Sequence, residues 1–260
     1  MDFPWGPLHY VIQGRGEPLL VIHGERESQV NSTLLDRLAS TFTVVAPALP
    51  GFPPSGVPPW MRSTTEMASV MNWFLRRLAL GPVGALGFGF GGWVAAEMAV
   101  QRPEGLTALV LQSPLGIKPH PGQEIVDRFL FVEEDYIALG FSNGRTPRSA
   151  LDEPDETTLR AWDAAREMTT RVAFKPYMFN PALPHLLAGM AIPSLVVWGE
   201  QDSLVPRSCA ERYVETIDGA ALTIVPGGHW LDLEAPDHLC DLVVDFMSRD
   251  HAGTPGNTIN

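Results

Sequence analysis

Positive charge, cysteine and long apolar runs are all scarce in this sequence of 260 residues. The 18 Lys and Arg against 30 Asp and Glu leave a formal net charge of −12, which repels a nucleic-acid backbone and an anionic membrane surface alike. No apolar run approaches the ~18 residues of a membrane span, and the first residues lack the basic and apolar regions of a signal peptide. We therefore expect a cytoplasmic protein with neither a nucleic-acid nor a membrane partner.

The sequence also has few cysteines and no pattern of metal ligands. The two cysteines, Cys209 and Cys240, are too few for a disulfide framework, lack metal-ligand spacing and fall on helical patterns where a thiol packs as a small hydrophobe. No metal-ligand cluster and no cofactor motif is found along the sequence, so we expect no metal and cofactor-free operation. A hydrophobic fraction of 45% with 18% charged residues is typical of a globular protein.

What the sequence does have is a regular alternation of short apolar runs and helical patterns. Seven runs, each closed by Gly, Pro or a polar residue, indicate strands: Leu8–Ile12, Leu19–His23, Phe42–Ala46, Val83–Gly87, Ala108–Gln112, Ser194–Trp198 and Ala221–Val225. Amphipathic patterns predict helices over Ser63–Leu80, Phe90–Arg102, Arg207–Ile217 and Ala235–Ser248. The alternation predicts an α/β fold with a mostly parallel, doubly wound sheet that is covered on both faces.

The alternation breaks between about Pro114 and Ala191, where helical patterns over Ile125–Leu139 and Thr157–Phe174 occur without a convincing strand. We predict an α/β core over residues 1–114 and 192–250, a helical lid over 115–191, and a flexible tail over 251–260. The acidic clusters of this stretch are interpreted as solvated helix faces. Its aromatic residues favour an apolar or aromatic small-molecule substrate: Phe129, Phe131, Tyr136, Phe141, Trp162, Phe174, Tyr177 and Phe179. The oligomeric state stays open.

The most informative segment is a glycine-dense turn between an apolar run and a helical pattern, Val83–Met98. One interpretation is a dinucleotide-binding G-x-G-x-x-G, formed by Gly87, Gly89 and Gly92. It is disfavoured, because the next strand ends at Gln112-Ser113, without the acidic residue that would bind a ribose, and because three earlier strands precede the motif.

The other interpretation is a nucleophile elbow, G-x-S-x-G, which places one side chain in an exposed, strained position above the sheet. The matching residues are Gly87-Phe88-Gly89-Phe90-Gly91, so Gly89 occupies the position of the serine. The helix that begins at Phe90 would supply an N–H to an oxyanion.

Four motifs in this order resemble the α/β-hydrolase family from about Leu8 to Phe246. They are His23-Gly24, then Leu49-Pro50-Gly51-Phe52 with Ser55, then Trp198-Gly199-Glu200-Gln201-Asp202, and finally Gly228-His229-Trp230. The resemblance implies an α/β-hydrolase fold in which Asp202 is the acid and His229 the base. It also implies an oxyanion hole from the N–H groups of Glu25 and Phe90. The aromatic Phe88 and Trp230 are expected at the substrate, together with His23, which we interpret as a hydrogen-bonding group that shapes its loop rather than as a base.

Two departures from the family pattern bear on function. Gly89 offers no nucleophile, so an acyl-enzyme on serine is not available at the usual place. Glu25-Arg26 puts a carboxylate beside the expected oxyanion hole, where it would oppose a developing oxyanion unless Arg26 or another cation neutralises it. Serines on nearby loops, Ser28, Ser55, Ser113 and Ser203, lie in no elbow and are weak candidates for a replacement.

We therefore expect an enzyme in which the His229–Asp202 dyad acts as general base on water or substrate. Ester or lactone hydrolysis, C–C cleavage and lyase-type proton transfer would all use this equipment, and the sequence does not choose among them. Two alternatives stay open: a non-catalytic small-molecule-binding pseudoenzyme, and a Ser-to-Gly variant of an ordinary serine esterase.

Overall fold

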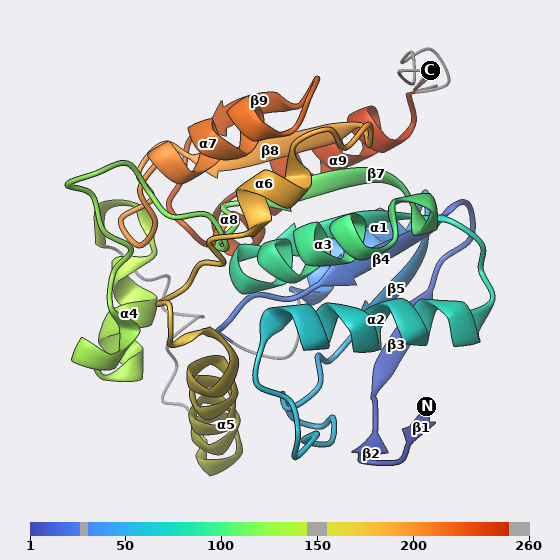
Figure 1. Cartoon of the computed structure of the whole chain (residues 1–260), viewed down its shortest axis with the longest axis horizontal. Coiled ribbons are helices and arrows are strands. Elements are labelled where there is room, and N and C mark those ends of the chain that lie inside the picture. Colours follow the sequence, from blue (N-terminus) through green and yellow to red (C-terminus); the bar gives the residue numbers. More distant parts are fainter. Residues whose placement is uncertain (27–30, 145–154, 250–260) are drawn as a thin grey trace.

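The computed structural model describes residues 1–26, 31–144 and 155–249 and is built around one seven-stranded sheet (Figure 1). The strand order is β3-β5-β4-β6-β7-β8-β9, with β3 antiparallel to β5 and every other neighbouring pair parallel. The strands are β3 (Tyr10–Gln13), β4 (Pro18–Ile22), β5 (Thr43–Pro47), β6 (Val83–Phe88), β7 (Leu106–Gln112), β8 (Ser194–Gly199) and β9 (Ala221–Val225). The predicted doubly wound α/β architecture is confirmed, and each predicted strand is present within about two residues.

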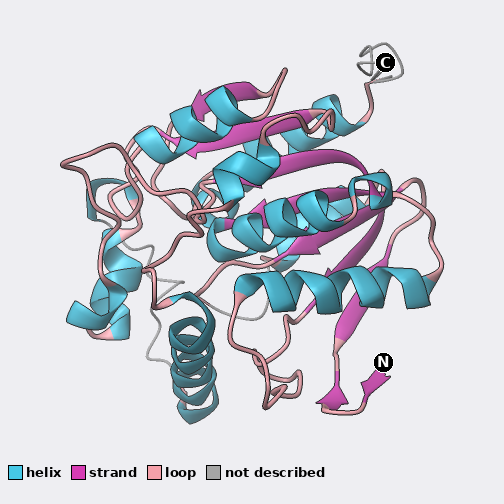
Figure 2. Ribbon diagram, viewed as in Figure 1, coloured by secondary structure: helices cyan, strands magenta, loops and turns pink. Residues whose placement is uncertain are grey.

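Helices cover both faces of the sheet, as expected for buried parallel strands (Figure 2). On one face lie α2 (Thr64–Leu78), α3 (Gly89–Gln101), α6 (Leu183–Leu187) and α7 (Ser208–Thr216). On the other lie α1 (Ser32–Ala39), α8 (Leu231–Glu234) and α9 (Pro236–Met247). Cys209 on α7 and Cys240 on α9 are both buried and free, as predicted.

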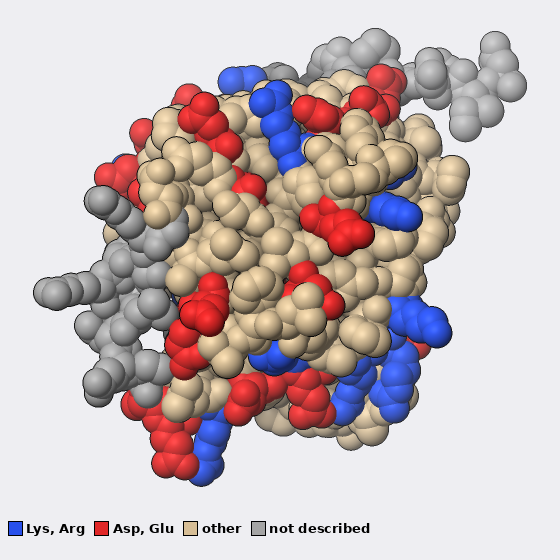
Figure 3. All heavy atoms as spheres, turned by 90° about the vertical axis from the view of Figure 1, so that its left-hand side faces the viewer, with Lys and Arg blue, Asp and Glu red and all other residues tan. Residues whose placement is uncertain are grey.

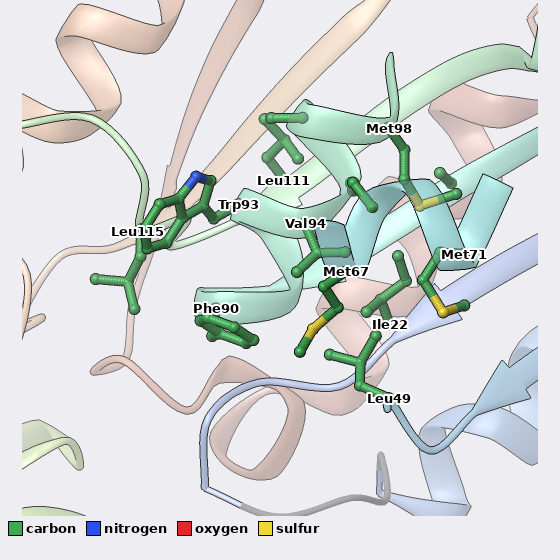
Figure 4. Close-up of a cluster of buried hydrophobic side chains, with 14 of the residues drawn as sticks. Ile22, Leu49, Met67, Met71, Phe90, Trp93, Val94, Met98, Leu111 and Leu115 are labelled. Atoms are coloured by element: carbon green, nitrogen blue, oxygen red, sulfur yellow. The ribbon is translucent and has the colours of Figure 1, made fainter. Parts of the chain in front are cut away.

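The larger core lies where α2 and α3 pack on the sheet (Figure 4). Met67 and Met71 of α2 meet Val94 and Met98 of α3 over Ile22 of β4, all buried. The unbranched methionines fill the irregular space between two helices that lie against one sheet. This packing fixes the start of α3, and therefore the glycine-dense turn, relative to the end of β4.

The segment between β7 and β8 lies at the carboxyl ends of the parallel strands, on the left of Figure 1. It contains α4 (Glu133–Leu139) and α5 (Glu156–Ala173) as well as α6. The helix expected over Ile125–Leu139 is shorter than predicted: Arg128–Leu130 is a single 3-10 turn, and α4 begins only at Glu133. Three acidic residues fill the first turn of α4, where their negative charges stabilise the positive end of the helix dipole.

The sequence patterns missed several short elements: a hairpin of β1 (Asp2–Phe3) with β2 (Gly6–Pro7), and helices α1, α6 and α8. Each is too short for periodicity to stand out. The tail predicted over 251–260 lies outside the described residues. None of the described helices is long and apolar enough to cross a membrane.

Candidate active site

The glycine-dense turn joins β6 to α3, and its backbone leaves the strand at Gly89 with a positive φ of 44°. The turn lies very close to β4: a Cβ on Gly91 would stand 2.2 Å from the carbonyl oxygen of His23. Glycine is therefore required at Gly91 by the close approach of two backbones. The helix start that results points the N–H of Phe90 toward the carboxyl edge of the sheet.

The space beside Gly89 is occupied by the carboxylate of Glu25, which comes from the loop after β4. A Cβ on Gly89 would lie 2.5 Å from Glu25 Oε2 and 3.2 Å from His229 Nε2. The Phe90 N–H donates to the same Oε2 at 3.0 Å. A glutamate from a neighbouring loop thus fills the position that a side chain at residue 89 would take.

His229 follows β9 and faces two carboxylates, one on each ring nitrogen. Its Nδ1 is 2.8 Å from Asp202 Oδ2, so the contact expected between these two side chains is present. Its Nε2 stands 3.4 Å from Glu25 Oε1, which is an ion-pair distance, and this buried nitrogen makes no hydrogen bond within the described residues. The side chains of Glu25, Asp202 and His229 are all almost completely buried.

The other oxygen of the Asp202 carboxylate serves the backbone. Oδ1 accepts the N–H groups of Leu204 and Val205, each at 3.0 Å. One carboxylate therefore both caps a turn and orients the imidazole. With Oδ1 held in this way, Oδ2 is fixed toward His229.

Glu25 and His229 shift each other's pKa in opposite directions. Burial works to raise the pKa of Glu25, but the contact and charge of His229, with the N–H groups of Phe90 and of Glu25 itself, lower it to about 2. Burial works to lower the pKa of His229, but Asp202 and then Glu25 raise it to about 10. At neutral pH the site therefore holds an imidazolium between two carboxylates.

Two residues of the segment before and within α4 complete the surroundings of Glu25. The Tyr136 hydroxyl donates to Glu25 Oε1 at 3.2 Å, and the buried Arg128 guanidinium donates to the backbone carbonyl of Glu25 at 2.8 Å. Arg128 is itself paired with Glu133. In the sequence Tyr136 is one of several aromatic residues of the predicted lid, and no motif marks either Tyr136 or Arg128.

Trp230, expected at the substrate, ties the loop after β9 that carries His229 (the histidine loop) to α4. Its indole N–H donates to the Ile137 carbonyl at 2.9 Å, and its ring packs edge-on against His229. The His229 N–H donates to the Gly140 carbonyl at 2.6 Å. The position of His229 therefore depends on α4 as well as on β9.

His23 and Phe88, also expected at the substrate, both make the contacts that are described within the protein itself. Both ring nitrogens of His23 are used by backbone partners, Nδ1 by Gly24 O at 2.7 Å and Nε2 by Leu49 N at 2.9 Å, and burial lowers its pKa to about 4. His23 therefore shapes the loop. The Phe88 side chain packs in the core on the α1 and α9 face, because alternate side chains of β6 point to opposite faces.

Arg26, considered above as a counter-charge for Glu25, pairs instead with the buried Asp232 at 3.6 Å. Of the cations near Glu25, His229 stands 3.4 Å from its carboxylate, and the buried Arg128 guanidinium also interacts with Glu25 electrostatically.

The loop serines differ in their surroundings. Ser55 bonds to the backbone of Ala48 and His9, and Ser203 is exposed. Ser113 is buried without a hydrogen-bond partner for its hydroxyl, and Ser28 lies outside the described residues. Within the described part of the chain no group of three His, Cys, Asp or Glu side chains could hold a metal ion.

Comparison of the chain with known proteins identifies its family. The pattern described as "Alpha/beta hydrolase family" matches residues 19–241. A 2-hydroxy-6-oxo-6-(2'-aminophenyl)hexa-2,4-dienoic acid hydrolase of Metapseudomonas resinovorans is 25% identical, over 92% of this chain and 87% of that protein. Haloalkane dehalogenase 2 of Mycobacterium tuberculosis is 27% identical, over 94% and 92%.

Solved structures agree on the fold. A serine hydrolase involved in carbazole degradation superposes with a TM-score of 0.75 at 23% identity, covering 92% of this chain and 93% of that one. A lipase-like protein of Acinetobacter baumannii gives 0.79 at 20% identity, covering 95% and 89%. The family pattern spans most of the chain, and the protein therefore belongs to the alpha/beta hydrolase family.

Proposed function

We propose that this protein is a hydrolase of apolar or aromatic small molecules that works without a serine nucleophile and uses His229, oriented by Asp202, to move protons. The observation that carries the proposal is the arrangement around Gly89. A carboxylate and an imidazole occupy the space beside a residue that has no side chain, with the second imidazole nitrogen held by Asp202. One buried cluster therefore supplies a proton carrier, an acid that orients it, and a carboxylate in the place of the missing nucleophile.

The charge state of His229 refines the role expected from the sequence. With a pKa raised to about 10 the imidazole is protonated at neutral pH, and a protonated imidazole donates a proton rather than accepting one. His229 therefore acts first as a general acid. It becomes a base only after it has given up its proton or after the charge of Glu25 has been removed.

A non-catalytic binding protein is the second candidate, and one observation favours it. The Phe90 N–H, which would stabilise an oxyanion on a substrate, already donates to Glu25, and both Glu25 and His229 are buried. In that case the ion pair between Glu25 and His229 permanently fills the site and keeps a substrate out. The two proposals differ in whether any turnover depends on His229.

The third alternative, a serine esterase with Gly substituted at residue 89, is opposed by the same packing. A serine side chain there would overlap with Glu25 Oε2, at 2.5 Å from its Cβ, so Glu25 and a serine cannot share the site as it stands. A parent esterase would need Glu25 to lie elsewhere.

The test compares the wild type with His229→Ala on p-nitrophenyl esters, aryl lactones, vinylogous diketones and aryl epoxides. We expect turnover of at least one class and a loss of ~10² to 10⁴-fold in His229→Ala, the size typical of removing a proton-transfer group. The matched control is His238→Ala, because His238 is an exposed residue of α9 to which no role in the site is assigned. Turnover that is equal in all three proteins refutes the proposed role of His229, and turnover that is absent from every substrate class leaves the non-catalytic binding protein.

A further inference from the structure

We propose that the Glu25 carboxylate, supplied by the loop after β4, is itself the nucleophile, and that it attacks a saturated carbon of an apolar epoxide. This inference rests on the proposed function and assigns its missing nucleophile and its substrate class.

The first support is position. Glu25 Oε2 stands 2.5 Å from the Cβ that residue 89 would have, and Oε1 stands 3.4 Å from His229 Nε2. A carboxylate oxygen therefore lies beside the proton carrier, within the space that a nucleophile on residue 89 would use. Its depressed pKa keeps Glu25 ionised, and thus nucleophilic, at any ordinary pH.

The second support is the occupation of the Phe90 N–H. Attack on an ester carbonyl would create an oxyanion on the substrate, and this donor is already used by Glu25 Oε2 at 3.0 Å. Attack on a saturated carbon creates no such oxyanion. In the hydrolysis that must follow, the oxyanion forms on the Glu25 carboxyl itself, where the Phe90 N–H already lies.

The third support is the proton on His229. Opening of an epoxide leaves an alkoxide that needs a proton, and the imidazolium at Nε2 is a proton donor beside the attacking oxygen. The buried Tyr136 hydroxyl, whose pKa burial raises well above the usual value, stays protonated as a second donor at Oε1. A strained ring that leaves as an alcohol fits this set of groups.

The first step is the opening of the epoxide ring. A lone pair of Glu25 Oε1 forms a bond to an epoxide carbon while the carbon–oxygen bond breaks, and the freed oxygen takes the Nε2 proton of His229. The products are a hydroxyalkyl ester on Glu25 and a neutral imidazole. Because the ester carries no charge, Glu25 no longer raises the pKa of His229, and only Asp202 still does. The neutral imidazole, which has given up its proton, can now accept another.

In the second step neutral His229 takes a proton from water, and the water oxygen adds to Cδ of Glu25. Negative charge develops on Oε2, and collapse breaks the bond from Cδ to the ester oxygen. The leaving alkoxide takes the proton from His229, and the Glu25 carboxyl returns its own proton to His229. The net reaction is an epoxide and one water giving a diol, with the starting ion pair restored.

Isotope placement tests this sequence of bonds directly. A single turnover of styrene oxide by excess wild-type protein in H₂¹⁸O should give a diol without ¹⁸O and a Glu25 peptide heavier by one ¹⁸O. Glu25→Gln should lose more than ~10³-fold in turnover, as for removal of a nucleophile. The control Glu97→Gln, another buried carboxylate whose partners are Trp93, Asn180 and Thr65, should still place ¹⁸O at Glu25.

The outcomes separate this inference from the proposed function. An ¹⁸O atom in the diol and none in Glu25 means direct attack by water and overturns the inference, while His229-dependent turnover keeps the proposed function. The inference is also overturned, and the proposed function kept, if the protein hydrolyses an ester or lactone in a His229-dependent way but styrene oxide does not react at Glu25. Absence of turnover on every substrate class overturns both.

Discussion

At residue 89 a side chain and the Glu25 carboxylate compete for one volume, and this sets a prediction for Gly89→Ser. We expect the single variant to show no esterase activity and to lose about 1–3 kcal/mol of stability, because its Cβ would stand 2.5 Å from Glu25 Oε2. The double variant Gly89→Ser with Glu25→Ala relieves the overlap and leaves the Phe90 N–H unoccupied. It should hydrolyse p-nitrophenyl acetate and react with a fluorophosphonate probe.

The matched control is Gly89→Ala with Glu25→Ala, which has the same space and no hydroxyl. Its fluorophosphonate labelling should equal background, as should that of the wild type. Efficient labelling of Gly89→Ser alone would contradict the prediction, since it would mean that Glu25 leaves the site at little cost.

The ion pair between Glu25 and His229 also predicts how stability depends on pH. The pKa of Glu25 is lowered to about 2, so its contribution is present above its unfolded value near 4.5 and is lost as pH falls toward 2. The pKa of His229 is raised to about 10, so its contribution is complete below its unfolded value near 6.5 and is lost as pH rises through 10. Between these unfolded values both contributions are complete.

Urea unfolding of the wild type and of Glu25→Gln, at intervals from pH 6 to pH 10, checks the alkaline side. The wild type should be more stable than the variant at pH 6, and this difference should shrink steadily as pH rises. The reason is that unfolded His229 loses its proton above its ordinary pKa of 6.5, so folding must take up a proton from solution. A difference that stays constant over this range would show that His229 carries no proton opposite Glu25.

At the scale of elements, the short helix α4 and the histidine loop depend on one another. Gly140 follows α4 with an ordinary φ of −76°, yet a Cβ there would stand 2.1 Å from Trp230 Nε1. We predict that Gly140→Ala loses about 1–3 kcal/mol of stability and most of its turnover, because the Trp230 contact and the His229 backbone bond to Gly140 are displaced together.

Thermal unfolding and turnover measured side by side check this, with Gly105→Ala as the control. A Cβ on Gly105 meets only the flexible Arg102 side chain, at 3.3 Å. The control should keep wild-type turnover. If Gly140→Ala also kept wild-type turnover and stability, the coupling of α4 to the histidine loop would be wrong.

The same scale explains what the sequence could and could not predict. The seven strands of the sheet and the long helices α2, α3, α5 and α9 follow from hydrophobic periodicity, and the order of the Gly-rich turn, Asp202 and His229 follows from motifs. The role of the Glu25 carboxylate does not. A motif places the backbone of residue 25 beside the turn, but only packing decides that its side chain folds back onto the Phe90 N–H, or that Arg26 turns to Asp232 instead.

For the whole molecule, charge sets the last prediction. The chain carries a net charge of −12, and Asp and Glu side chains are spread over the face at the carboxyl ends of the strands (Figure 3). Inside the site two carboxylates, Asp202 and Glu25, face one imidazolium. An anionic substrate therefore meets repulsion both on approach and on arrival, while a neutral one does not.

We expect styrene oxide to exceed its 4-carboxy analogue in kcat/KM by about tenfold or more at low ionic strength. Added salt should narrow the gap but not close it. The long-range part of the repulsion is screened within a Debye length of about 10 Å at 0.1 M salt, whereas the buried pair is shielded from salt. Preference for the carboxylate substrate at every ionic strength would contradict this prediction. It would require positive charge in the site that outweighs both Glu25 and Asp202, which protonated His229 alone does not supply.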